Sequence, residues 1–224
     1  MDYTIKIGGE AGQGIQTIGD ALARVFARAG YHVFSDQDYE SRIRGGHNFY
    51  RIRLSDRPVR APKEQIDILV ALDRESILQH EQELAGQGRI IYDSATLNEK
   101  RDSPSFLDIP FAKLAVEQGG DRIMANTVAM GAVLGMLGMD LQPLLDLITS
   151  TFQRKGEQVI AANRNAAMAG YDHAVTGCLT CSFSADKDDG GRPHMLVGGA
   201  EAIALGALTS GLKFYSAYPM TPST

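Results

Sequence analysis

Four glycines lie within the segment Gly8–Gly14 (GGEAGQG), between a short apolar stretch and a helical pattern that begins at Ile15. Glycine reaches positive φ angles and lets a backbone approach a ligand, because no Cβ stands in the way. A helix that begins directly after such a loop directs free N–H groups and the positive end of its dipole toward it. The spacing therefore predicts a site for phosphate or another anion. The alternative is a tight strand-to-helix turn that binds nothing.

The glycine segment matches neither of the common phosphate loops. Its order, Gly9-x-x-Gly12-x-Gly14, reverses the G-x-G-x-x-G of dinucleotide-binding folds. The lysine and hydroxyl residue of a P-loop do not follow Gly14. Asp36 ends the second predicted strand, about where a ribose-binding acid would stand. A nicotinamide cofactor therefore stays open as an alternative ligand.

A second polar segment, Ser35–Asn48, follows that strand. Open α/β sheets place their ligand crevice just past the ends of their strands. Arg42 and Arg44 could grip a carboxylate or a phosphate. Gly45 and Gly46 would turn the chain beside them. The segment is a second candidate for ligand contact, and a solvated loop is the alternative.

The remaining chemically interesting residues favour structural roles. Cys178 and Cys181 form a C-x-x-C pair, which is half of a zinc or iron–sulfur motif, and a redox dithiol is the other possibility. His80 belongs to an otherwise charged helical pattern, so we expect it at the surface. Small residues recur at helical spacing over 126–139, which predicts close packing of two helices or of a helix on a sheet.

Strand and helix patterns alternate along the chain. We expect strands at 3–7, 31–34, 49–54, 66–72 and 89–92, extended chain over 103–110, and helices at 15–29, 74–84, 111–118, 126–139, 141–152 and 156–170. The first strand, helix and second strand predict a right-handed parallel crossover. These elements indicate a three-layer α/β fold, with an open, mostly parallel, Rossmann-like sheet and helices on both faces.

The pattern breaks down over 171–193, where residues 186–193 have the composition of a linker. A helix at 200–210 and a strand at 213–217 follow, and the sequence stops after Thr224. One helix and one strand cannot bury a core. We therefore expect 196–224 to be a C-terminal fragment of a second α/β domain.

Composition narrows the functional classes. The chain has 224 residues, a net charge of −5 and a hydrophobic share of 44%. This charge argues against a nucleic-acid partner. We find neither an apolar run of roughly 18 residues nor a signal sequence at the N-terminus, so we expect no membrane association. With only two cysteines, the chain is expected in the cytoplasm.

Three stretches in this order resemble the 2-oxoacid:ferredoxin oxidoreductases: Gly8–Ile15, Ser41–Asn48 (SRIRGGHN), and Gly199–Ala207 together with Tyr218–Ser223 (YPMTPS). In that family a γ domain can precede the α (pyrimidine-binding) domain. The resemblance divides the chain into a γ domain at 1–171, a linker at 172–195 and the truncated beginning of the α domain at 196–224.

The resemblance implies a reaction and its cofactors. Such enzymes decarboxylate a 2-oxoacid on thiamine diphosphate, pass electrons through [4Fe–4S] clusters to ferredoxin and transfer the acyl group to coenzyme A. It implies that Thr221, in the Tyr-Pro-x-Thr-Pro motif, touches substrate or cofactor at the active site. It also implies a coenzyme A site near the γ-domain residues Gly9, Gly12, Gly14, Arg44, Gly45 and Gly46.

The chain departs from the family in ways that imply partners. It has no four-cysteine cluster motif, and the family's glutamate that activates thiamine would lie beyond Thr224. We therefore expect thiamine diphosphate and the clusters to be held mainly by a partner β subunit, in a dimer of heterodimers that reduces ferredoxin. The chain alone would be inactive. A nicotinamide-dependent oxidoreductase and a non-catalytic assembly module remain the rival hypotheses.

Overall fold

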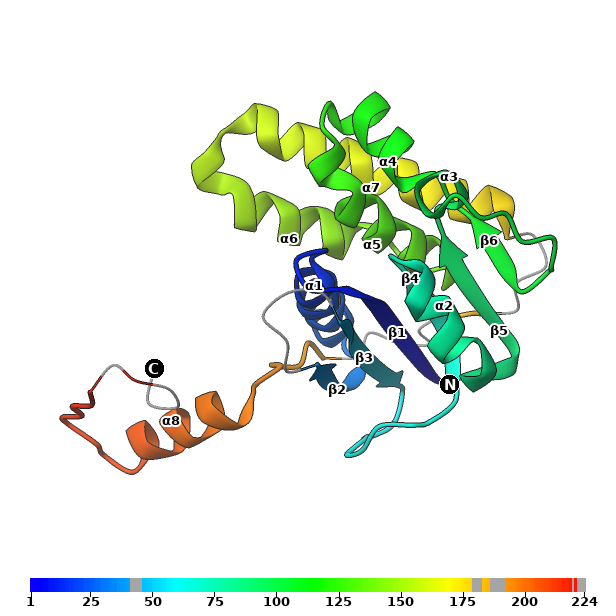
Figure 1. Cartoon of the computed structure of the whole chain (residues 1–224). Helices are drawn as coiled ribbons and strands as arrows, with labels where there is room; N and C mark the ends of the chain where they lie inside the picture. The colour runs from blue at the N-terminus through cyan, green and yellow to red at the C-terminus, as the bar shows by residue number, and fades with distance from the viewer. Residues whose placement is uncertain (41–45, 179–182, 186–191, 219, 221–224) are drawn as a thin grey trace. The chain divides into compact units, whose positions relative to one another are not determined.

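The computed structural model describes residues 1–40, 46–178, 183–185, 192–218 and 220. Its contacts divide the chain into two compact units, Met1–His194 and Met195–Thr224. The first unit holds the whole sheet and most of the helices (Figure 1). Among the described residues, no helix is both long enough and apolar enough to cross a lipid bilayer.

The sheet has six strands in the order β2-β3-β1-β4-β5-β6. Parallel pairing joins β1 to β4, β4 to β5 and β5 to β6, whereas β3 pairs antiparallel with both of its neighbours. The strands are β1 (Asp2–Glu10), β2 (His32–Tyr39), β3 (His47–Ser55), β4 (Ile66–Ala71), β5 (Leu84–Tyr92) and β6 (Phe106–Asp108). The predicted mostly parallel α/β sheet is confirmed.

Helices cover both faces of the sheet, as expected. The helices are α1 (Ile15–Arg28), α2 (Arg74–His80), α3 (Ser94–Leu97), α4 (Phe111–Leu114), α5 (Ala125–Met136), α6 (Gln142–Phe152), α7 (Glu157–Gly177) and α8 (Gly199–Thr209). Successive strand residues point to opposite faces. A Cβ on Gly8 would meet Ser76 of α2, and one on Gly9 would meet Ile15 of α1. Helices α1 and α2 therefore lie on opposite faces (Figure 1).

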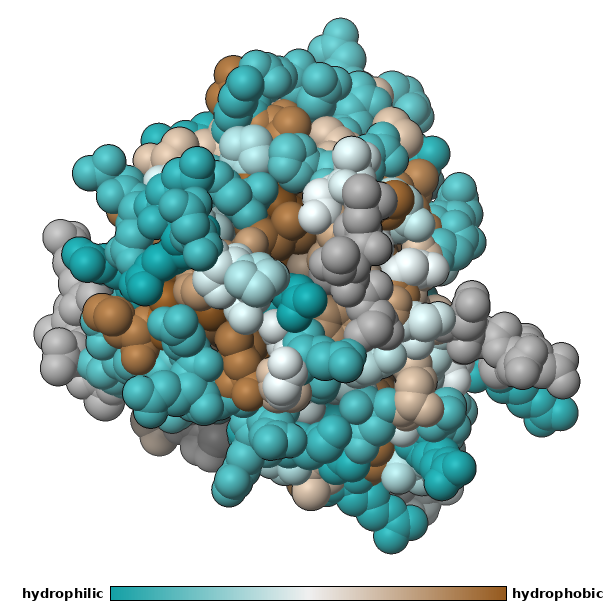
Figure 2. All heavy atoms as spheres, turned by 90° about the vertical axis from the view of Figure 1, so that its right-hand side faces the viewer, coloured by the Kyte–Doolittle hydropathy of each residue, from teal (hydrophilic) through white to brown (hydrophobic). Residues whose placement is uncertain are grey.

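The core forms where apolar strands are covered on both sides. Ile66, Leu69 and Ile90 are fully buried in the parallel part of the sheet, as continuous apolar runs require. Tyr92 packs edge-to-face against Phe106 at 5.5 Å between ring centroids. Polar side chains cover most of the face seen in Figure 2, with smaller hydrophobic areas between them.

The small residues of α5 allow close helix packing, as predicted. A Cβ on Gly131 would lie 2.0 Å from the carbonyl oxygen of Ala167, and one on Gly135 would lie 2.5 Å from that of Tyr171. A Cβ on Gly170 of α7 would lie 2.0 Å from the carbonyl oxygen of Val128. These two helices therefore touch backbone to backbone, side by side in Figure 1.

Several predicted boundaries were wrong. Strand β1 continues through Gly8 and Gly9 to Glu10, because its ladder with β3 reaches that far. Strand β2 runs parallel to β1, as the predicted crossover requires, although β3 lies between the two strands. Helix α7 runs on to Gly177, and its buried face continues through Ala174. Residues 213–217 form no strand, because the second unit has no described strand to pair with them.

Candidate functional site

The glycine loop lies at the carboxyl end of β1 and is a closed turn. Gly12 and Gly14 adopt φ angles of 95° and 82°. The Gln13 amide donates to the Glu10 carbonyl at 3.2 Å. The Glu10 amide in turn donates to Gln13 Oε1 at 2.8 Å. Positive φ at two positions explains why this turn needs glycine.

Two side-chain contacts fix the loop to the elements beside it. Asn126 Nδ2, at the start of α5, donates to the Gln13 carbonyl at 3.0 Å. Gln13 Nε2 donates to the carbonyl of Leu72, just past β4, at 3.4 Å. A Cβ on Gly14 would lie 2.1 Å from Asn126 Nδ2. The loop is therefore held in one place by neighbours that leave no room for a larger residue at Gly14.

The loop leads into an uncapped helix. Gly14 is the N-cap of α1, and neither a side-chain cap nor an acidic residue occupies the first turn. The Ile18 amide is the first to bond within the helix, to the Gly14 carbonyl at 3.0 Å. The amides of the preceding turn thus have no intrahelical acceptor. No atom of the described residues lies within 4 Å of a Cβ built on Gly12. This combination suits an anion at the loop.

A hollow of about 420 Å³ lies against this helix start, the end of β2 and the start of β3. Aromatic and acidic side chains share its wall with the loop, namely Tyr39, Phe49, Tyr50, Asp38 and Glu40. The Tyr50 hydroxyl donates to Asp20 Oδ1 at 2.9 Å. Burial raises the pKa of Tyr50 to about 12, so the phenol stays a neutral donor. The hollow can hold an aromatic or aliphatic group next to the anion position.

A second hollow, of about 200 Å³, lies on the other side of the loop, near the ends of β4 and β5. Gln13, Asn126 and Arg122 line it. Asp93 also lines it, but backbone amides of Thr96 and Ala112 occupy its two oxygens, each at 3.0 Å. Arg122 is exposed and makes no ion pair with any described residue. Arg122 was not predicted from the sequence, since a single arginine before a helix carries no distinctive pattern.

The predicted site residues divide into those that the structure describes and those that lie outside the described residues. The structure brings Gly9, Gly12 and Gly14 together, although Gly9 lies in β1, where a Cβ would stand 2.4 Å from Gln13 Oε1. Gly46 has a φ of 85° directly before β3. Arg44, Gly45 and Thr221 lie outside the described residues, as does Cys181.

The structure also bears on the predictions for Asp36 and His80. Asp36 accepts from Arg51 Nε at 2.9 Å and from Arg51 Nη2 at 2.7 Å. Both of its oxygens are therefore engaged across β2 and β3, which disfavours a ribose-binding role. The prediction that His80 lies at the surface was wrong, because its side chain is buried among residues of β1 and β3. Within the described ranges, no three His, Cys, Asp or Glu residues gather as metal ligands.

Comparison with known proteins adds three findings. Residues 4–173 match the sequence model of the pyruvate ferredoxin/flavodoxin oxidoreductase family. The chain is 25% identical to a 2-oxoacid:ferredoxin oxidoreductase subunit alpha of Sulfolobus sp. over its whole length, but it spans only 41% of that protein. It is 32% identical to the 2-oxoglutarate synthase subunit KorC of Archaeoglobus fulgidus, over 73% of the chain and 85% of that subunit.

Solved structures agree with these sequence matches. A 2-oxoglutarate:ferredoxin oxidoreductase from Magnetococcus marinus, with 2-oxoglutarate, coenzyme A and succinyl-CoA bound, superposes with a TM-score of 0.85 and 26% identity. The matched region covers 99% of this chain and 39% of the Magnetococcus marinus chain. A keto/oxoacid ferredoxin oxidoreductase gamma subunit from Geobacter sulfurreducens has the same fold, with a TM-score of 0.65 at 24% identity, covering 79% of this chain and 98% of that one.

Proposed function

Because the chain belongs to the pyruvate ferredoxin/flavodoxin oxidoreductase family, we propose that it serves as part of a 2-oxoacid:ferredoxin oxidoreductase. That enzyme converts a 2-oxoacid, coenzyme A and oxidised ferredoxin into acyl-CoA, carbon dioxide and reduced ferredoxin. Residues 1–171 are the γ-type domain, and the sequence from 196 onward begins the α-type domain. The curated relatives support this role, since they are named as subunits of such enzymes.

The γ-type domain contributes to the coenzyme A site. The observation that carries this assignment is the uncapped start of α1 beside Gly12, which opens onto a hollow at the carboxyl edge of the sheet. Free amides at a helix start bind phosphate oxygens well. Coenzyme A carries several phosphates, and the Magnetococcus marinus relative was solved with it bound. Arg44 and Arg122 are the cations assigned to the same ligand.

The other cofactors belong mainly to partner subunits. Thiamine diphosphate supplies the carbanion chemistry of decarboxylation when it is bound in the complex. The described residues offer no cluster of metal ligands, so the [4Fe–4S] clusters are assigned to a β subunit. The complex is a dimer of heterodimers that reduces ferredoxin. From the resemblance of its Tyr-Pro-x-Thr-Pro motif, we assign Thr221 to contact with substrate or cofactor in the assembled enzyme, where its hydroxyl would donate to an oxygen of that ligand.

A matched pair of glycine variants tests the coenzyme A assignment. Gly12 and Gly138 both have positive φ, at 95° and 63°, and a Cβ at either position would meet no atom of the residues that the structure describes within 4 Å. In the assembled enzyme, Gly12→Ala should raise the KM for coenzyme A several-fold and leave the KM for the 2-oxoacid unchanged. Gly138→Ala should alter neither constant. Equal coenzyme A constants in both variants would show that the loop only packs, as an assembly module would require.

A further inference from the structure

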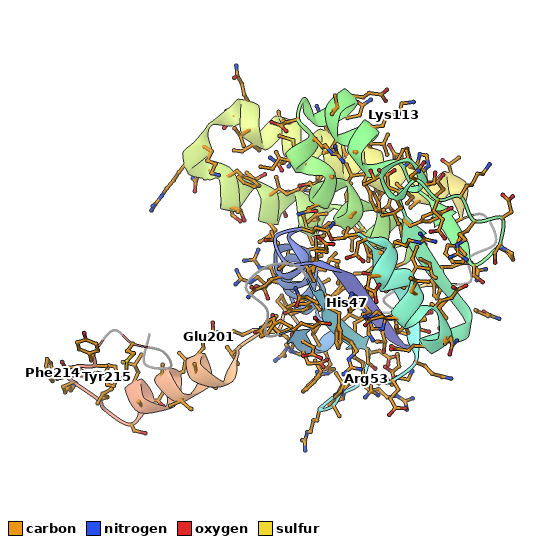
Figure 3. The ribbon with its side chains drawn as sticks, in the orientation of Figure 1. His47, Arg53, Lys113, Glu201, Phe214 and Tyr215 are labelled. Atoms are coloured by element: carbon orange, nitrogen blue, oxygen red, sulfur yellow. The ribbon has the colours of Figure 1, made fainter. Side chains whose placement is uncertain are left out.

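Four titratable side chains meet beneath the sheet, on the face that α2 covers. Lys6 comes from β1, His47 from the start of β3, His80 from the end of α2 and Glu83 from the turn after it. Lys6, His47 and His80 are only 2%, 9% and 4% exposed. Figure 3 labels His47 at this position in the sheet. The coenzyme A site does not use these groups.

The four groups form one continuous chain of polar contacts. His47 Nε2 lies 2.7 Å from His80 Nε2. His80 Nδ1 lies 2.8 Å from Glu83 Oε1 and 3.2 Å from Lys6 Nζ. Lys6 pairs with the other oxygen of Glu83 and sits 4.4 Å above the ring of Phe49. The lysine and the glutamate balance each other, so the two histidines are neutral in the least costly arrangement.

Counting protons along this chain identifies the atom that titrates. Glu83 Oε1 is the nearer partner of His80 Nδ1, at 2.8 Å against 3.2 Å for Lys6 Nζ, so we assign the ring proton to Nδ1, where it is donated to Glu83. Lys6 is then a neighbour of that nitrogen and not a donor to it, and a neutral His80 accepts at Nε2. His47 must then donate from Nε2, which leaves His47 Nδ1 with a lone pair. His47 Nδ1 is buried and has no hydrogen-bond partner among the described residues. It is thus the one ring nitrogen of the pair where a further proton can be added without breaking an existing contact.

His47 also sits against the strand end that carries the glycine loop. In the β1–β3 ladder it lies opposite Glu10, the residue before the loop. Its Cε1 would lie 3.2 Å from a Cβ built on Gly8, and the Ser76 hydroxyl would lie 2.6 Å from the same point. The His47 ring therefore lies directly beside the last residues of β1.

We propose that Lys6, His47, His80 and Glu83 form an acid-sensitive latch that fixes the loop end of β1, and that a proton added at His47 Nδ1 releases it. The added charge would lie on a buried ring 2.7 Å from His80, with no hydrogen-bonded counter-ion among the described residues. A buried unpaired charge is costly, so the protonated state favours opening of the strand end toward water.

The charges around the latch set the direction of its response. Burial lowers the pKa of His47 and of His80 below the usual histidine range. Burial also lowers the pKa of Lys6, against the pull of Glu83. The other charged groups that act on His47 or Lys6 are Asp73 and Glu75 of the α2 region, Arg51 of β3, Asp36 of β2 and Glu40. The attraction of Asp73 is the strongest charge effect on His47, and desolvation outweighs it.

Amide hydrogen exchange of the full chain between pH 5 and 7.5 tests the latch. The exchange rates of the Gly8–Glu10 amides are divided by their intrinsic rates at each pH. These corrected rates should rise as the pH falls below about 6.5, because opening is linked to the uptake of one proton. The rise should approach a factor of about ten per pH unit. His47→Gln keeps a donor near the Nε2 position but cannot titrate, so its corrected rates should be flat. His173→Gln changes a histidine of α7 outside the latch and should behave like the wild type.

A histidine titration followed by NMR gives a second readout that needs no variant. The His47 Cε1–H signal should titrate with a midpoint below 6.5. Asp73→Asn keeps the cap of α2 but removes the charge, and should lower that midpoint further. Flat exchange in the wild type, a His47→Gln variant that keeps the acid response, or a His47 midpoint above 6.5 would each overturn the latch. None of these measurements depends on coenzyme A binding.

Discussion

The contact between Gly14 and Asn126 can be tested with a double-mutant cycle on the free energy of unfolding. Gly14→Ala places a Cβ 2.1 Å from Asn126 Nδ2 and puts alanine at a φ of 82°. The left-handed backbone costs an L-residue about 1 kcal/mol. Displacing Asn126 loses its hydrogen bond to Gln13, which costs about 1 kcal/mol more. The single variant should therefore lose about 2 kcal/mol.

The second arm of the cycle separates the two costs. Asn126→Ala should lose about 1 kcal/mol, the value of its bond to the loop. In the double variant, the methyl group added at position 14 no longer meets the amide of residue 126. The backbone strain and the lost hydrogen bond then each count once, so the loss should be about 2 kcal/mol, whereas the two single-variant losses would add to about 3 kcal/mol.

Urea unfolding followed by circular dichroism measures the cycle, because the chain has no tryptophan. Additive losses in the double variant, at an unchanged denaturant slope, would show that Gly14 and Asn126 do not compete for space.

Three further predictions concern packing, pH and ligand charge. Gly131→Leu should cost about 3 kcal/mol of unfolding free energy, because a side chain there meets the backbone of Ala167; an unchanged urea midpoint would refute the contact. Because burial lowers the folded-state pKa of His47 and His80, the unfolded chain binds more protons below about pH 6.5. Stability should thus be full above that pH and decline below it, and urea midpoints that stay constant from pH 7.5 to 5 would contradict this. Arg122→Gln should raise the KM for coenzyme A in the assembled enzyme severalfold without changing that for the 2-oxoacid, whereas an equal rise in both would indicate a structural role.

Local patterns were sufficient to predict the elements near the loop. The apolar run at 66–72 marks a strand that is buried on both faces, and the helical spacing from Ile15 marks a helix that is buried on one face. Both patterns can be read from neighbouring residues alone. The glycine loop was predictable for a similar reason, since positive φ restricts Gly12 and Gly14 to glycine. Family resemblance was also present in the sequence, as the match over 4–173 confirms.

Features that depend on distant partners were not predictable. His80 lies on a charged helix, and it is buried only because Lys6 and His47 arrive from two other strands. Asp36 looked like a ribose-binding acid until Arg51 of the neighbouring strand engaged both of its oxygens. The insertion of β3 between β1 and β2 depends on pairing across the sheet, which short-range periodicity does not encode.

Hydrogen exchange of the assembled enzyme with and without coenzyme A tests the central claim most directly. The claim is that the uncapped first turn of α1 holds part of this ligand. Saturating coenzyme A should slow exchange at the amides of residues 12–17, and saturating 2-oxoacid alone should not. Unchanged exchange at these amides, in a complex that is shown to have bound coenzyme A, would contradict the account.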